Sequence, residues 1–141
     1  TRNRFVFTGN ERHTGPGLLE FLEDGNVIHC SPISSLDDIL KEITRKGLGA
    51  TGGVDNVGKL IGLITDYDIR KALSNKKINE GIIAKEMMNS KPSFFHPEDK
   101  AYDVLLQMEE RERPISVAPV VDKDQKFLGM VSVHDLLQKG L

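Results

Sequence analysis

Apolar and polar positions follow the same pattern in two separate stretches of the chain. When the sequence is laid over itself, Val54–Ile69 matches Val121–Leu136 along its length. Each stretch contains an apolar run that ends in the string Gly-x-x-[Ser/Thr]-x-x-Asp. Self-similarity of this kind is the signature of a duplicated structural unit. The sequence therefore predicts two copies of one unit within its 141 residues.

Each copy also contains a stretch with helical periodicity. Apolar residues at positions i, i+3, i+4 and i+7 predict an amphipathic helix. They are Leu36, Ile39, Leu40 and Ile43 in the first copy, and Ala101, Val104, Leu105 and Met108 in the second. Ser34 or Ser35 is a suitable N-cap for the first helix, and Gly47 is a natural stop. For the second helix, Pro97 suits the first helical position and Pro114 bars continuation.

Two strands follow each predicted helix. The polar segments Asp55–Gly58 and Asp122–Gln125 each lie between two apolar runs, an arrangement that indicates strand, turn, strand. A second short helical pattern begins after the last strand of each copy. Asn26–His29 and Ser93–His96 add a short extended segment, so each copy reads β-α-β-β-α. A helix between strands implies a crossover. We therefore expect an α/β (α+β) fold with mixed sheets and helices on one face.

The repeat sets the expected domain boundaries. We interpret residues 17–73 as the first copy, 74–81 as a linker, and 82–141 as the second copy. Residues 1–16 match neither copy and are interpreted as a linker or the remnant of a preceding region. Within the second copy, Ile82–Met88 is expected to form a helical turn that answers Leu18–Leu22. The chain begins without Met or a signal pattern, so we expect it to be a piece of a longer protein.

Composition excludes several classes of function. The net charge of −2 and pI near 6.1 lack the basic stripe that binds a phosphate backbone, so we expect no nucleic acid partner. Apolar stretches such as Leu60–Ile64 are far shorter than a membrane span. A single cysteine, Cys30, rules out an intramolecular disulfide and favours a cytoplasmic location. The four histidines are scattered, so no metal site is expected.

The two Gly-x-x-[Ser/Thr]-x-x-Asp strings, in register and each preceded by a matched helix and turn, resemble those of a tandem CBS domain pair. The resemblance covers about Gly17–Leu141. It implies two modules with pseudo-two-fold symmetry and two clefts that hold adenine nucleotides. Thr65 and Ser132 would then contact phosphate, and Asp68 and Asp135 would accept hydrogen bonds from ribose hydroxyls.

Each of these residues also has a plain structural interpretation. [Ser/Thr]-x-x-Asp at a helix start is a capping-box pattern that serves only the first backbone donors. The resemblance assigns contact with the base to backbone at Leu48 to Ala50 and Ile115 to Val117, although apolar strand residues there also suit a core. Arg113 and Arg70 could offset phosphate charge, or could lie on a solvated surface.

The first copy departs from the family pattern before its turn. It has Thr51-Gly52-Gly53 where branched apolar residues are usual. Glycine pairs weaken a strand and mark a bulge or a close backbone approach. The shape of the first cleft is therefore in question, and Pro119-Val120-Val121 makes the second copy the safer template.

Within the CBS group, three phrases look like the C-terminal pair of sugar-phosphate isomerases of the arabinose 5-phosphate isomerase type. They are Arg45-Lys46-Gly47-Leu48-Gly49, Gly62–Leu73 and His134–Leu137. The resemblance implies that the catalytic sugar isomerase domain lies N-terminal to this region and acts in Kdo and lipopolysaccharide synthesis. We therefore expect no catalytic residues here and no required cofactor.

The regulatory ligand would be AMP, ATP, or a nucleotide-sugar such as CMP-Kdo. The resemblance further implies a homodimer formed through the modules. Two alternatives remain open at this point: a structural dimerisation module with empty clefts, and a stand-alone pair that regulates another protein. The sensing hypothesis requires that the two strand-to-helix junctions near Thr65 and Ser132 are equivalent corners that face a shared groove.

Overall fold

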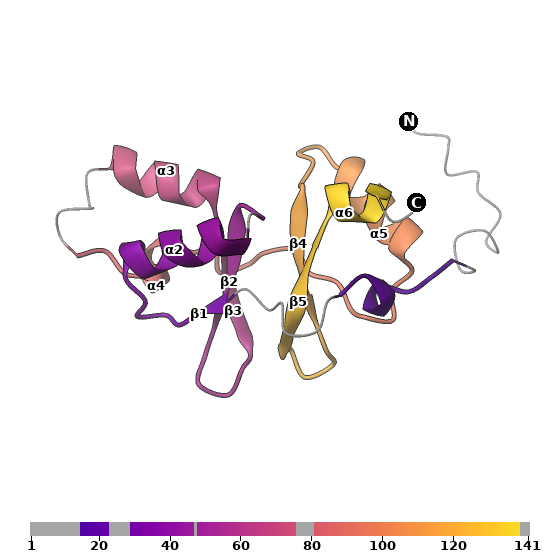
Figure 1. Cartoon of the computed structure of the whole chain (residues 1–141), viewed down its shortest axis with the longest axis horizontal. Coiled ribbons are helices and arrows are strands. Elements are labelled where there is room, and N and C mark those ends of the chain that lie inside the picture. The colour runs from indigo at the N-terminus through magenta and orange to yellow at the C-terminus, as the bar shows by residue number, and fades with distance from the viewer. Residues whose placement is uncertain (1–14, 23–28, 47, 76–80, 139–141) are drawn as a thin grey trace.

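The computed structural model describes residues 15–22, 29–46, 48–75 and 81–138, which form two bodies joined through their sheets (Figure 1). In chain order the elements are η2 Leu18–Phe21, β1 His29–Cys30, α2 Leu36–Lys46, β2 Ala50–Val54, β3 Leu60–Thr65, α3 Asp66–Ser74, α4 Ala84–Met87, α5 Ala101–Glu109, β4 Val117–Val121, β5 Phe127–Ser132 and α6 Val133–Gln138. We call β1–β3 with α2, α3 and α4 the first module. We call β4 and β5 with η2, α5 and α6 the second module.

The two long helices lie where the apolar periodicity predicts them. Ser35 caps α2, because its Oγ accepts a hydrogen bond from the backbone N–H of Asp38 at 3.2 Å. The prediction that Pro97 occupies the first helical position is wrong, since α5 begins at Ala101. Pro97 instead lies in a turn in which the backbone N–H of His96 donates to Oδ2 of Asp99 at 2.9 Å.

The turn before α5 is not helical because its carbonyls serve another segment. The backbone N–H of Leu19 donates to the carbonyl of Pro97 at 3.0 Å, and the N–H of Leu18 donates to that of Asp99 at 2.9 Å. The N–H of Ala101 donates to the carbonyl of Pro16 at 2.8 Å. Docking of η2 therefore fixes where α5 can start.

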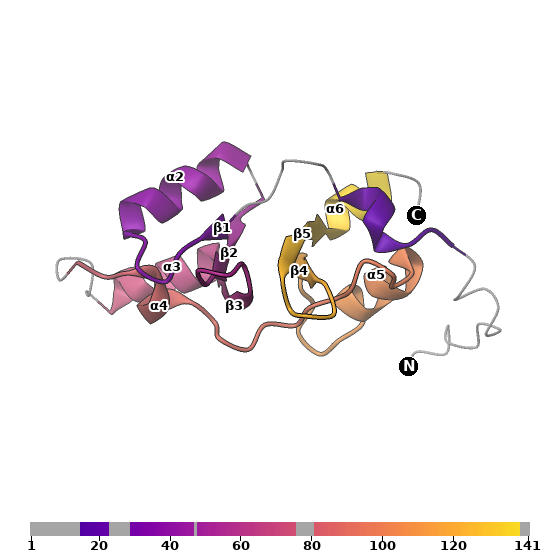
Figure 2. The same cartoon turned by 90° about the horizontal axis from the view of Figure 1, so that it is seen from below.

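Both sheets follow the predicted strand, turn, strand order. In the first module β1 pairs parallel to β2, and β2 pairs antiparallel to β3, so this sheet is mixed as predicted. In the second module β4 pairs antiparallel to β5, and a parallel bridge from Phe95 to Val120 takes the place of β1. The helices cover the outer face of each sheet, and the inner faces of the two sheets pack against each other (Figure 2).

The inner faces form a core between the modules. It is composed of equivalent residues from the two copies, chiefly Ala50 with Val117 and Leu63 with Met130. Phe127 completes the cluster, with the partly buried Leu60 as its equivalent in the first copy. The interface is therefore built by the duplication itself, as the pseudo-two-fold expectation requires.

The leading segment of each copy packs on the module formed by the other copy. Leu18 and Phe21 of η2 belong to the core of the second module, together with α5 and α6. Ile82 and Met87 belong to the core of the first module, together with α2 and α3. The expected helical turns at Leu18–Leu22 and Ile82–Met88 are present as η2 and α4. Each packs on the module that contains the strands of the other copy. The units of packing therefore differ from the repeats in sequence at their leading segments.

The glycine pair of the first copy lies where other atoms approach the strand closely. A Cβ atom on Gly52 would lie 2.8 Å from Cζ of Phe127, and one on Gly53 would meet Cε of Met88. A bulge between Gly53 and Val54 is matched by a bulge at the equivalent point of β4, so the bulge belongs to the repeat. The close approach is what requires glycine, as the sequence indicated.

Candidate functional site

The two strand-to-helix junctions are equivalent in backbone path. The N–H of Asp66 donates to the carbonyl of Gly49 at 3.1 Å, and at the equivalent positions the N–H of Val133 donates to that of Ser116 at 2.9 Å. Both junctions lie at the end of the sheets opposite the hairpin turns (Figure 1). The two junctions are therefore equivalent corners, as predicted. That both face one shared groove stays a prediction, because the cavity described below is lined by Thr65 and Asp68 but not by Ser132 or Asp135.

Thr65 and Asp68 form a full capping box at the start of α3. Oδ2 of Asp68 accepts hydrogen bonds from the backbone N–H and the Oγ1 hydroxyl of Thr65, both at 2.9 Å. The N–H of Asp68 is 3.4 Å from Oγ1 of Thr65, which closes the box. The hydrogen bonds within the described residues leave Oδ1 of Asp68 available as an acceptor. The capping interpretation is therefore correct here, and it remains compatible with ligand binding.

The second junction keeps only half of this arrangement. Oγ of Ser132 accepts from the backbone N–H of Asp135 at 3.0 Å, so the hydroxyl caps α6. Ser132 is 8% exposed and lies among the buried polar residues. Its hydroxyl thus caps the helix, and the residue as a whole is buried.

A cavity of about 990 Å³ lies beside the first junction, between the two modules. The first module contributes Leu48, Gly49, Leu63 and residues of α3. Residues of α4 and the segments next to it also line this side. Residues 113–117, between α5 and β4, form the opposite wall, and residues 91–93 complete it. Pockets of 300–1000 Å³ are the usual size for a small-molecule site. The cavity can therefore hold a ligand of nucleotide size.

Most of the predicted binding residues meet at this cavity, although they come from both copies. Its lining includes Leu48, Thr65, Asp68, Arg113, Ile115 and Val117. Three predicted residues are not part of this lining: Ala50, which is fully buried in the core between the modules, Ser132 and Asp135. Arg70 is exposed on α3 and is also outside it. A cavity is thus formed beside the first junction, despite the doubt raised by Gly52-Gly53.

Several lining residues were not predicted. Lys71 and Lys91 add cationic groups, and Tyr67 and Asn89 add hydrogen-bonding groups. Lys71 lies three residues after Asp68, so helical periodicity could have placed the two on one face of α3. Asn89 and Lys91 lie at the cavity because α4 packs on the first module and Asn89 pairs with Leu63 of β3, and no sequence signal indicates this packing.

Met87 and Met88 fill the core of the first module. Met87 is 7% exposed within the first module, and Met88 packs against it. Both also form part of the cavity lining, together with Leu63 and Ile82. The cavity lining therefore includes apolar side chains suited to a ring and the cationic groups of Lys71, Lys91 and Arg113.

Other chemistries find little support in the described residues. They contain no group of three His, Cys, Asp or Glu side chains that could hold a metal ion. Burial raises the pKa of Cys30 to about 11, with a smaller contribution from the charge of Glu42, so its thiol stays protonated. No helix among them is long and apolar enough to cross a membrane.

Comparisons with known proteins agree on one family. The sequence model of the CBS domain matches residues 22–75 and 84–141. The arabinose 5-phosphate isomerase KdsD of Pseudomonas aeruginosa is 34% identical over 129 residues, which are 92% of this chain and 36% of that protein. The KdsD of Yersinia pestis is 38% identical over 117 residues, 79% of this chain and 33% of that protein. The chain thus spans about a third of the length of these relatives.

Solved structures show the same architecture. CBSX2 in complex with AMP superimposes with a TM-score of 0.76 at 23% identity, over 89% of this chain and 96% of that one. The CBS domain pair of MJ0100, in complex with 5′-methylthioadenosine and S-adenosyl-L-methionine, gives a TM-score of 0.74 at 26% identity, over 87% and 94% of the two chains. The predicted α+β fold with paired modules is confirmed.

Proposed function

The chain belongs to the CBS domain family, a family of regulatory and non-catalytic modules, and from this we propose that it senses a nucleotide-type ligand on behalf of a sugar-phosphate isomerase. The proposed ligand is an adenine nucleotide or a nucleotide-sugar such as CMP-Kdo. The proposed site is the cavity beside Thr65 and Asp68. The catalytic chemistry would belong to another domain of the parent protein.

The observation that carries the proposal is the composition of that cavity. One wall presents the carboxylate of Asp68, which can accept hydrogen bonds from vicinal hydroxyls through Oδ1. Opposite it, Arg113 offers a guanidinium that suits a phosphate. The apolar side chains of Leu63, Ile82 and Met88 in the lining suit a base. A ligand with ring, diol and anion would satisfy all three regions at once.

A related pair supports the choice of ligand class. The CBS pair of MJ0100, at 26% identity, holds 5′-methylthioadenosine and S-adenosyl-L-methionine. Both are adenosine derivatives with a ring and a ribose diol. The same two groups find matching surfaces in this cavity, and they support adenosine derivatives as the first compounds to test.

The parent protein is proposed from the KdsD relatives. Their identity of 34–38% extends over most of this chain but over only about a third of their own length. We infer a parent with an N-terminal sugar isomerase domain of the arabinose 5-phosphate isomerase type, acting in Kdo and lipopolysaccharide synthesis in the cytoplasm. Pairing of the modules between two chains would give a homodimer, to be measured by sedimentation.

A thermal-shift experiment tests ligand sensing directly. The 141-residue chain is heated with AMP, ATP, S-adenosylmethionine or CMP-Kdo, each over a range of concentrations. A ligand at a hundred times its Kd stabilises the folded state by about 2.7 kcal/mol, which raises the midpoint by several degrees. Asp68→Asn is the matched variant, because asparagine keeps an oxygen for the capping box and loses the charge.

The response distinguishes the alternatives. A shift with one of the compounds that is reduced by Asp68→Asn supports sensing in this cavity. Flat responses to all four would favour the structural alternative, a pairing module with empty clefts. A shift that persists in Asp68→Asn and disappears in Asp135→Asn would move the ligand to the other junction.

A further inference from the structure

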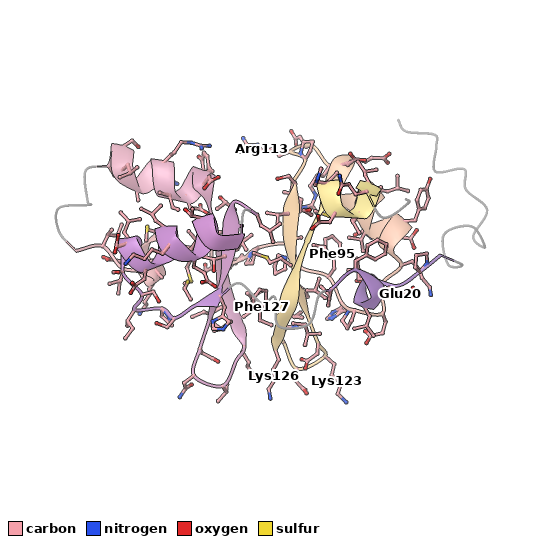
Figure 3. All side chains as sticks on the ribbon, in the orientation of Figure 1. Glu20, Phe95, Arg113, Lys123, Lys126 and Phe127 are labelled. Atoms are coloured by element: carbon pink, nitrogen blue, oxygen red, sulfur yellow. The ribbon has the colours of Figure 1, made fainter. Side chains whose placement is uncertain are left out.

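The connection between the long helix and the next strand differs in length between the two modules. In the first module α2 ends at Lys46 and β2 begins at Ala50, so residues 47–49 make the connection. In the second module α5 ends at Glu109 and β4 begins at Val117, so residues 110–116 make it. We call this longer connection the 110–116 loop. It lies at the upper end of the sheets, where Figure 3 labels Arg113.

The 110–116 loop is anchored so that it forms a wall of the cavity. Nη1 of Arg111 donates to Oγ of Ser93 at 2.8 Å, which ties the loop to another segment of the lining. The N–H of Ile115 donates to the carbonyl of Met108 at 3.0 Å, which holds the loop to the end of α5. Between these two anchors lies Arg113, exposed to solvent and part of the cavity lining.

Two further cations stand at the same mouth. Lys71 on α3 and Lys91 after α4 line the cavity with Arg113, and all three are exposed. No ion pair joins any of them to a carboxylate among the described residues. Two of the lining carboxylates, in contrast, already accept backbone hydrogen bonds: Asp68 from Thr65 and Glu86 from Ile83. A third carboxylate, that of Asp66, also lines the cavity, so the formal charges balance. What the cavity offers an anion is three cationic side chains that form no ion pair among the described residues.

Two of the three cationic positions carry no positive charge in the other copy. The residue six positions after Thr65 is Lys71, whereas six positions after Ser132 the sequence has Gln138. Five positions before His96 it has Lys91, whereas five positions before His29 it has Asp24. The 110–116 loop, which carries Arg113, is longer than its counterpart in the first copy. Counted back from β2 and β4, Arg113 corresponds to Lys46, so the duplication has kept the fold of the two junctions and only part of their charge.

We propose that the pair binds one anionic ligand per chain, in the cavity under the 110–116 loop, and that Arg113 is the residue that makes this cavity selective for an anion. This inference rests on the proposed function, and it adds the stoichiometry, the identity of the occupied cleft and the source of the preference for charge. The Ser132 junction then serves folding only.

Isothermal titration calorimetry with AMP and adenosine tests the proposal, because the two probes differ only in the phosphate. The wild-type chain should bind AMP at one site per chain and at least about tenfold more tightly than adenosine, the usual gain from a charge-assisted hydrogen bond. Arg113→Gln should reduce that ratio toward one, through a loss of AMP affinity and not of adenosine affinity. Lys123→Gln, on the distant hairpin turn labelled in Figure 3, is the charge-matched control and should change neither.

Each other outcome has a definite meaning. Two AMP sites per chain, or an AMP-to-adenosine ratio that Arg113→Gln leaves unchanged, overturns this inference and leaves nucleotide sensing standing. Equal affinity of the wild-type chain for AMP and adenosine would also overturn this inference and leave ligand sensing standing. Failure of both probes to bind overturns the adenosine form of the proposed function and this inference with it. Circular dichroism of Arg113→Gln excludes misfolding as the cause of any loss.

Discussion

Lys59 and Lys126 face each other as an antiparallel bridge across the boundary between the two modules. Reciprocal hydrogen bonds flank them: the N–H of Leu60 donates to the carbonyl of Gln125, and the N–H of Phe127 donates to that of Gly58, both at 2.9 Å. Each bond is the copy of the other under the duplication. The pseudo-two-fold axis therefore passes between the two lysines, and it fixes which faces of the sheets meet.

The inner faces of the sheets leave no room for a side chain at Gly52. A Cβ there would lie 2.8 Å from Cζ of Phe127, so we expect Gly52→Ala to destabilise the protein by about 1–3 kcal/mol. Urea denaturation measures the change. Phe127→Leu in the same chain should restore part of the loss. Gly15→Ala, where nothing lies within 4 Å, is the control, and an equal loss there would contradict this account.

Docking of η2 on the second module predicts a contrast between neighbouring leucines. Leu18 is fully buried in that module's core, whereas Leu19 is 65% exposed. Leu18→Ala should therefore cost about 2–5 kcal/mol of unfolding free energy, and Leu19→Ala less than about 0.5 kcal/mol. Chemical denaturation of both variants provides the comparison. Similar small effects would mean that the segment before β1 does not dock as the structure shows.

The hairpin turn of the second module contains a removable strain. Gln125 has φ of 69°, and its equivalent in the first module is Gly58, with φ of 88°. Because a side chain disfavours this conformation, Gln125→Gly should stabilise the protein by about 0.5–1 kcal/mol after the entropy cost of glycine. Gly58→Ala should destabilise it by about 1 kcal/mol. A higher urea midpoint with an unchanged m-value would verify the first change, and a lower midpoint would refute it.

The capping box at α3 contributes to stability before any ligand binds. Thr65→Ala removes the hydroxyl that donates to Asp68 at 2.9 Å, and it should cost about 1 kcal/mol in the ligand-free chain. Thr65→Ser keeps the hydroxyl and should lie within about 0.5 kcal/mol of wild type. The midpoint of thermal unfolding without added nucleotide is the measurement. Equal stability of Thr65→Ala and wild type would leave ligand contact as the only role for this hydroxyl.

The aspartates of the two hairpin turns make stability depend on pH. Hydrogen bonds from backbone N–H groups hold the pKa of both carboxyls below the ordinary value of 3.8. The largest contribution comes from the N–H of Lys59 for Asp55 and from that of Lys126 for Asp122. A depressed pKa in the folded state means that the unfolded chain binds more protons in this range. The resulting stabilisation is complete above pH 3.8 and is lost as the pH falls through the lower folded-state values.

The Asp55→Asn, Asp122→Asn double variant should therefore lose less stability than wild type over the interval below pH 3.8. Urea midpoints across that interval give the two slopes. Asp124→Asn removes a carboxylate of the same turn that takes none of these backbone hydrogen bonds, so its slope should match wild type. Identical slopes for all three chains would show that the turns do not contribute.

Patterns confined to a few neighbouring residues predicted most of the local structure. Ser35 caps α2, and the box between Thr65 and Asp68 forms as its spacing indicates. Asp55 and Asp122 close equivalent turns through the same side-chain hydrogen bonds. These interactions depend on fixed separations along the chain, so the sequence contains all the information that they need. Pro97 is the exception, because distant backbone donors captured the carbonyls of its turn.

The sequence by itself determined the duplication, the order of the elements, the equivalence of the two junctions and the family. Only the tertiary structure decided that η2 and α4 exchange modules, that the first junction faces the described cavity, and that Arg113 of the second copy lies across from Asp68 of the first. The reason is that the apolar pattern of η2 and that of α4 are compatible with the core of either module. The shape of each core, the loop lengths and the burial of each side chain decide which module each segment packs on. These depend on the packing of the whole chain.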